Sequence, residues 1–152
     1  MSTSELSAPG PAGLFHLLVH STGPLGAPRN TLNLTVYTPK GEVTGHSQVT
    51  QAVSPPVRVD SHVTGTWNYE IVGGKLPGTV RIDLNGWPEI HWPPRAGIGP
   101  VIPQNYKSTL LLRAGSTSGV IRYEYRTDLV GAWHVVAEQP VEVTVEPQVG
   151  AA

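Results

Sequence analysis

The chain contains short segments in which apolar and polar residues alternate with a period of two. The longest covers residues 57–71, where valine, tryptophan, tyrosine and isoleucine dominate one parity and polar residues take the other. Such alternation is typical of β-strands that turn one face to a core and the other to water. The same pattern recurs at residues 31–36, 80–84, 121–126 and 141–146.

Further strands are predicted at residues 14–21, 42–51, 106–113 and 132–137, for about nine strands in all. Turn-forming residues separate the strands at 39–41, 73–75, 115–119 and 128–131. Short connections make antiparallel neighbours, and strands with one apolar face must pack sheet on sheet or close into a ring. We therefore expect an all-β fold, an antiparallel β-sandwich, with a small β-barrel as the alternative.

A chain of 152 residues suits one domain with its own core. We expect a flexible N-terminus at residues 1–13, a single domain at residues 14–146 and a flexible C-terminus at residues 147–152. Glycine and proline are abundant, with 17 and 15 residues, but they cluster between the alternating segments. The composition therefore indicates a folded β-domain with many turns.

Composition and charge exclude several classes of function. The chain has no cysteine, which excludes thiol catalysis and zinc–thiolate sites. A net charge of -1 with scattered basic residues indicates no nucleic-acid partner. No apolar run approaches the ~20 residues of a membrane helix, and residues 1–8 contain no Lys or Arg to begin a signal peptide. We expect no membrane partner and a cytoplasmic location, with leaderless export left open.

The six histidines do not form a pattern that binds a metal. His16 and His20 share one strand face but lie about 13 Å apart, too far to chelate one ion. Asp60 and His62 share a polar face, where side chains two apart are usually solvated. Residues 115–119 resemble a nucleophile elbow but carry Thr117 at the centre. We therefore predict no metal, no cofactor and no catalytic residue.

Residues 85–104 concentrate two of the four tryptophans and five of the fifteen prolines. Because proline fixes φ and removes a hydrogen-bond donor, we expect a stiff loop rather than a central strand. One interpretation is a stacking platform for sugars or another flat ligand. The alternatives are that the loop caps the core or that it contacts another copy of the chain. The candidate binding residues are Trp87, Glu89, His91, Trp92 and Arg95.

Three segments carry a resemblance to a known family: "VTQAVSPP" at 49–56, "GTWNYE" at 65–70 and "IHWPPRAGIGPVIPQN" at 90–105. Their order resembles a small bacterial family that is catalogued only as a domain of unknown function. Some of its members carry a second short uncharacterised domain after the first. The resemblance covers about residues 14–145 and implies a compact β-sandwich of bacterial origin. It implies no activity, cofactor or catalytic residue.

The sequence leaves the function unknown and supports three hypotheses. The first is a non-enzymatic binding or interaction module that uses the loop at 87–103 and the neighbouring residues 51–56, with a small molecule or glycan as ligand. The second is a structural or self-assembling protein with the same loop as its oligomer interface. The third is an uncharacterised enzyme, which would need polar groups to converge from different strands.

Overall fold

The computed structural model describes residues 14–70, 78–88, 103–113, 117–128 and 131–147. These residues form eight β-strands and one short 3₁₀ turn at Thr38–Lys40, which ends at Gly41 with a φ of 62°. The strands are β1 (Leu14–Ser21), β2 (Arg29–Tyr37), β3 (Glu42–Gln51), β4 (Val57–Glu70), β5 (Thr79–Pro88), β6 (Tyr106–Arg113), β7 (Ser118–Tyr125) and β8 (His134–Pro147).

The strands form a closed antiparallel barrel in which each strand pairs with the next along the chain. The ring closes between the first and last strands, where Phe15 lies opposite Pro147 and Ser21 opposite Val141. The all-β class is thus confirmed. Of the two expected architectures, the barrel is found and the sandwich is not, because β1 and β8 satisfy each other's backbone groups instead of leaving free edges.

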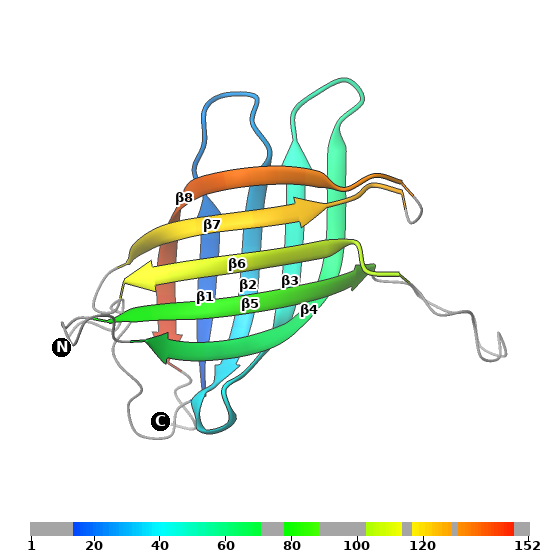
Figure 1. The fold of residues 1–152 in the computed structure, drawn as a ribbon. Coiled ribbons are helices and arrows are strands. Elements are labelled where there is room, and N and C mark those ends of the chain that lie inside the picture. The colour runs from blue at the N-terminus through cyan, green and yellow to red at the C-terminus, as the bar shows by residue number, and fades with distance from the viewer. Residues whose placement is uncertain (1–13, 71–77, 89–102, 114–116, 129–130, 148–152) are drawn as a thin grey trace, which may run out of the picture.

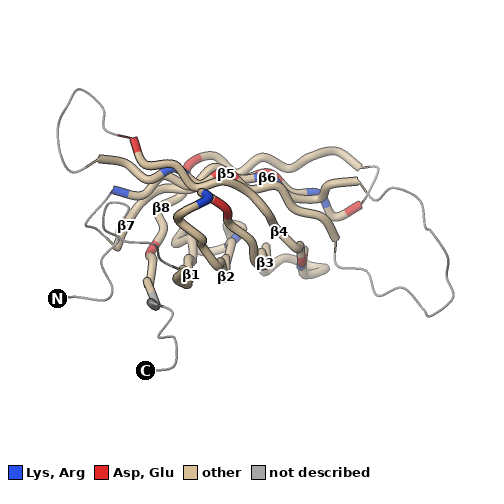
Figure 2. The backbone as a smooth tube through the Cα atoms, turned by 90° about the horizontal axis from the view of Figure 1, so that it is seen from below, with Lys and Arg blue, Asp and Glu red and all other residues tan. Residues whose placement is uncertain are grey.

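The barrel is flattened into two layers whose strands cross at a steep angle (Figures 1 and 2). Strands β1, β2 and β3 make one layer, and β5, β6 and β7 make the other. The two longest strands, β4 and β8, have 14 residues each and curve from one layer into the other (Figure 1). Strands that change layers are the usual corners of an orthogonal β-packing.

Two glycines in adjacent strands allow the backbones to approach closely at the β4 corner. A side chain at Gly65 in β4 would collide with the carbonyl oxygen of Asp83, and one at Gly45 in β3 would collide with that of Asn33. Glycine inside a strand is typical of such a bend at a barrel corner. The corner therefore depends on the absence of side chains at these positions.

The strand count is eight instead of the expected nine. Residues 134–137 and 141–146 of the two predicted segments belong to the single strand β8, which continues through Pro140. The register shifts between Ile121 and Tyr123 on β7, whose partners on β8 are Gln139 and Val136. The extra residue on β8 is a β-bulge, which inverts the parity of the apolar positions and so resembled a break between strands.

The inward parity of the strands supplies the core, as the alternation predicted. The core packs Trp67 edge-on against Phe15, with 5.4 Å between ring centroids. The aliphatic side chains that are almost fully buried are Leu17, Val19, Leu32, Leu34, Val36, Val49, Val63, Val80, Ile82, Leu110, Leu112 and Ile121. Because these side chains come from both layers, from β1 through β7, the barrel interior is a packed core.

Buried polar groups gather inside one end of the barrel, where residues 22–28 join β1 to β2 and residues 52–56 join β3 to β4. We call this the loop end. The Tyr106 hydroxyl donates to Asn30 Oδ1 over 2.5 Å, and Asn30 Nδ2 donates to Ser47 Oγ over 2.9 Å. Ser61 Oγ donates to Asn105 Oδ1 over 2.7 Å. These bonds satisfy groups that would otherwise be costly to bury.

Candidate functional site

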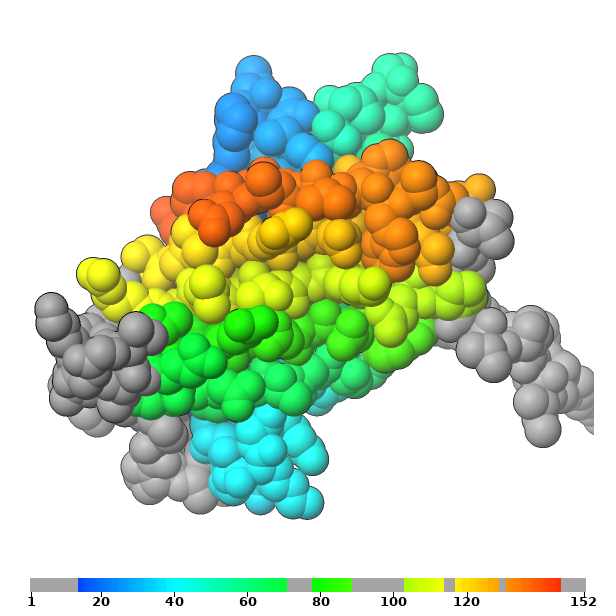
Figure 3. All heavy atoms as spheres, viewed as in Figure 1, coloured from blue at the N-terminus to red at the C-terminus, as the bar shows by residue number. Residues whose placement is uncertain are grey.

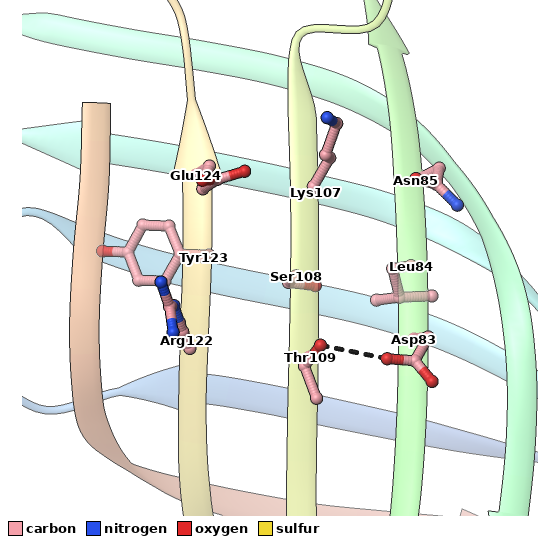
Figure 4. A pocket seen from close by; sticks show the side chains of 9 residues that line it. All are labelled: Asp83, Leu84, Asn85, Lys107, Ser108, Thr109, Arg122, Tyr123 and Glu124. Carbon is pink, nitrogen blue, oxygen red and sulfur yellow. Dashed lines mark hydrogen bonds between the residues drawn. The ribbon is translucent and has the colours of Figure 1, made fainter. Parts of the chain in front are cut away.

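A groove of about 420 Å³ crosses the outer surface of β5, β6 and β7 (Figure 4). Its walls are the outward side chains of the three strands together with the backbone between them. The lining residues are Asp83, Leu84, Asn85, Lys107, Ser108, Thr109, Arg122, Tyr123 and Glu124. Its volume falls in the range of sites that hold small ligands, about 300–1,000 Å³.

Strand register places the polar side chains of the groove in two cross-strand rows. Asn85 lies opposite Lys107, which lies opposite Glu124. In the same way, Asp83 lies opposite Thr109, which lies opposite Arg122. Directly opposed residues have Cβ atoms about 5 Å apart, so each row presents three polar groups within reach of one small molecule.

Only one of the two carboxylates in the groove is engaged by neighbouring side chains. Asp83 accepts a hydrogen bond from Thr109 Oγ1 over 3.0 Å. It also forms an ion pair with Arg81, whose Nε lies 3.0 Å from Asp83 Oδ2. Among the described residues, no hydrogen bond or ion pair engages the side chains of Asn85, Arg122 or Glu124. These three groups can therefore bind a ligand without first breaking a hydrogen bond or ion pair to a described residue.

Two tryptophans border the groove toward the loop end. The Trp133 ring centroid lies 4.8 Å from Lys107 Nζ and 4.7 Å from Arg126 Cζ, so both cations contact its π-system. Arg126 is also held by the Gln104 carbonyl over 2.8 Å. Trp87 follows Asn85 by two residues on β5 and so lies on the same outward face, where it is half-buried.

The structure corrects the prediction that residues 85–104 form a loop from their first residue. Trp87 and Pro88 belong to β5, where Trp87 lies opposite His62 and Pro88 opposite Ser61 of β4. Proline is tolerated there because β5 pairs with β6 only as far as Gly86, which leaves Pro88 with one neighbouring strand. The other predicted binding residues, which are Glu89, His91, Trp92 and Arg95, lie outside the described residues.

The groove is made largely of residues that sequence reasoning missed. Lys107, Arg122, Glu124 and Trp133 were not singled out, although the first three occupy the polar parity of predicted strands. The alternation shows that these side chains face water, but only the register shows that they lie side by side. Of the predicted binding residues, only Trp87 lies in the described part of the chain, and it borders the groove without lining it.

His16 and His20 make separate contacts on the outer surface. His16 hydrogen-bonds to Thr35 over 3.2 Å, and His20 pairs with Glu142 over 3.2 Å. Within the described part of the chain, no three His, Asp or Glu residues lie together as a metal site. None of the helical structure in these residues is long and apolar enough to cross a membrane.

Asp60 is bound by three side chains, those of Arg58, His46 and Gln48. Arg58 Nε lies 2.9 Å from Asp60 Oδ2, and His46 Nε2 lies 3.4 Å from Asp60 Oδ1. Partial burial raises the pKa of Asp60, but hydrogen bonds from Arg58, Gln48 and His46 outweigh it, so that the pKa lies below 3.8. His62 instead lies opposite His46 on β3 and Trp87 on β5.

The fold and the groove define the class of this protein, an eight-stranded up-and-down β-barrel with a polar groove on its outer surface. The chain belongs to a family described as "Domain of unknown function (DUF1842)", which matches residues 12–133. The expected resemblance to a domain of unknown function is therefore confirmed. The match includes β1 to β7 and ends before β8. The comparison with curated proteins gives no match.

Proposed function

We propose that the protein is a non-enzymatic binding module that holds an uncharged polar ligand, such as a glycan, in the groove across β5, β6 and β7. The observation that carries the proposal is the groove itself, where polar side chains from three strands lie close together. Among them, Asn85, Arg122 and Glu124 form no hydrogen bond or ion pair with the described residues. Trp87 and Trp133 border it on the side of the loop end.

The charge of the groove supports an uncharged ligand. The two carboxylates, Asp83 and Glu124, are balanced by the two cations, Lys107 and Arg122. A lining with equal numbers of both charges does not favour an anion or a cation inside the groove. Planar amide, carboxylate and guanidinium groups instead offer paired donors and acceptors, which match the adjacent hydroxyl groups of a sugar.

Titration of a glycan library, followed by tryptophan fluorescence and by NMR shifts of the backbone amides, tests the proposal. We expect ligand-dependent shifts on β5, β6 and β7. Replacing Asn85 by Ala is expected to weaken binding by about tenfold, because a bound hydroxyl loses its hydrogen-bond partner. Replacing Trp133 by Ala is expected to weaken it similarly and to reduce the fluorescence change.

Thr31→Ala is the matched control, since Thr31 is exposed on β2 in the other layer and should leave binding unchanged. Absence of glycan binding at millimolar concentration would refute the proposal that the ligand is a glycan. Binding that shifts the amide signals of the other layer and survives Asn85→Ala would refute the proposal that the groove is the binding site. Self-assembly through the loop at 87–103 stays a hypothesis, because residues 89–102 lie outside the described part of the chain.

A further inference from the structure

Two loops stand side by side beyond the edge of β8 at the loop end (Figure 3). They are the β1–β2 connection, residues 22–28, and the β3–β4 connection, residues 52–56. A second groove, of about 400 Å³, lies between them and is separate from the groove on β5, β6 and β7. Its lining residues are Leu25, Gly26, Ala27, Arg29, Thr50, Gln51, Ala52, Pro56 and Val57.

Hydrogen bonds fix the width of this groove. Gln51 Nε2 donates to the Gly26 carbonyl over 3.1 Å and so ties one loop to the other. Within the loops, Ala27 N donates to the Pro24 carbonyl over 3.1 Å, and Val53 N donates to the Gln51 carbonyl over 3.0 Å. A groove held in shape by such bonds loses little conformational entropy when a ligand enters.

Most of the surface that lines the groove is apolar. Leu25 is 98% exposed, Val57 is half-buried, and Ala27, Ala52 and Pro56 contribute further carbon surface. Residues 22–28 and 51–57 contain no charged side chain. Covering a large apolar side chain as exposed as Leu25 with an apolar group lowers the free energy, because both surfaces leave water.

One cation marks the edge of this apolar surface. Arg29 lies opposite Thr50, and Thr50 lies opposite Arg58, so the two arginines occupy the same row across β2, β3 and β4. Arg58 is paired with Asp60 over 2.9 Å. Arg29 has no ion pair with any residue that the structure describes. Arg29 therefore has its full charge available for an anionic group.

We propose that this groove binds a small amphiphilic carboxylate, with its alkyl chain between the two loops and its carboxylate on Arg29. A guanidinium that forms no ion pair with the described residues, beside a largely apolar groove, is complementary to a molecule with one anionic end and an apolar tail. Guanidinium groups bind carboxylates through two parallel hydrogen bonds, which favours this anion over a neutral alcohol. The proposal does not depend on a glycan in the other groove.

The test uses octanoate as the probe, with octan-1-ol as its neutral counterpart. Binding is followed by NMR shifts of residues 22–29 and 50–57 and by calorimetry. We expect octanoate to bind about tenfold more tightly than octan-1-ol. Lengthening the probe from hexanoate to decanoate should tighten binding about two- to fourfold for each methylene that the groove covers.

Arg29→Gln should weaken octanoate about tenfold and leave octan-1-ol unchanged, since only the carboxylate uses the charge. Arg113→Gln is the control, because Arg113 is an exposed arginine at the end of β6 that lies away from the loop end. Ala52→Trp, placed on an exposed loop position, should fill the groove and weaken both probes. Circular dichroism and thermal unfolding verify that each variant is folded.

Three results would overturn the proposal. The first is octanoate binding that is no tighter than octan-1-ol binding. The second is equal loss of octanoate affinity in Arg29→Gln and Arg113→Gln. The third is a mass that doubles with protein concentration and returns to the monomer value in Leu25→Asp, which would place a second copy of the chain on the groove instead.

Discussion

At the scale of single residues, the most constrained positions are the polar side chains inside the loop end. Asn30 is 1% exposed and connects three strands, because it bonds to Tyr106 of β6, to Ser47 of β3 and, through its backbone N–H, to Ser21 of β1. Each of these groups is buried, so each depends on the others for its hydrogen bonds. A change at one of them leaves its partners unsatisfied.

Replacing Tyr106 by Phe should lower the free energy of unfolding by about 1–2 kcal/mol, since Asn30 Oδ1 loses its donor in a buried site. Replacing Asn30 by Ala should lower it by about 3 kcal/mol, because several partners are orphaned together. Chemical denaturation measures both. Tyr37→Phe, at an exposed position, should change stability by less than about 0.5 kcal/mol. If Tyr106→Phe were equally neutral, the buried bond would contribute nothing.

Asp60 should make stability depend on acid pH. Its pKa is lower in the folded protein than in the unfolded chain, so its contribution is present above the unfolded value of about 3.9 and is lost as the pH falls through the folded value. At neutral pH, Asp60→Asn should be less stable than the wild type by about 0.5–1 kcal/mol, as for exposed ion pairs. Denaturation across this pH range measures the difference, which should vanish in strong acid. A difference that persists in strong acid would show that the ionised carboxylate of Asp60 is not the source of the stability.

At the scale of elements, the corner strands determine the shape of the barrel. β4 pairs with β3 through residues 57–66 and with β5 through residues 61–70, so its two halves lie in different layers. Gly65 lies in the shared part, where the neighbouring backbone of β5 occupies the space that a side chain would need. The bend of β4 therefore requires a residue without a side chain at position 65.

Gly65→Ala should destabilise the barrel by about 2–3 kcal/mol, because the added methyl group forces β4 away from β5. The neighbouring exposed Thr66→Ala serves as the comparison and should change stability by less than about 1 kcal/mol. Thermal denaturation of the two variants distinguishes a steric requirement at the corner from a general sensitivity of β4. A Gly65→Ala protein as stable as the wild type would show that the corner can relax.

Sequence patterns predicted most elements but not their arrangement. The predicted segments 14–21, 42–51 and 106–113 coincide with β1, β3 and β6, because turn-forming residues between the segments mark where strands begin and end. The pattern failed at Pro88 and Pro140, where pairing on only one side and a nearby bulge allow a proline inside a strand. The groove was not predictable, since it depends on which strands are neighbours and on their register.

At the scale of the whole molecule, the enclosed interior makes the barrel sensitive to alkali. Burial raises the pKa of Tyr106, Tyr123 and Tyr125 above the ordinary value of 10.0. Tyr106 and Tyr123 stack with 6.4 Å between ring centroids, and Tyr123 and Tyr125 with 6.2 Å. The folded barrel therefore favours the neutral form of all three side chains, whereas the unfolded chain permits ionisation.

The stability that these tyrosines contribute should be fully present below about pH 10 and should decline as the pH rises toward their folded values. Ultraviolet absorbance of tyrosinate and circular dichroism, recorded together, measure the effect. We expect a late rise in tyrosinate that coincides with unfolding. In Tyr106→Phe, the decline of stability in alkali should be less steep. Complete ionisation of the three tyrosines in a barrel that stays folded would contradict their burial in the barrel interior.

The pairing of β1 with β8 also sets an order in time. During synthesis, β1 can find β2 early, but its other neighbour consists of residues 141–147, which are made more than one hundred residues later. Until then, β1 and the most recent strand each present a row of unpaired backbone groups. The nascent barrel is thus an open sheet that can pair with other chains, and the arrival of β8 ends that exposure.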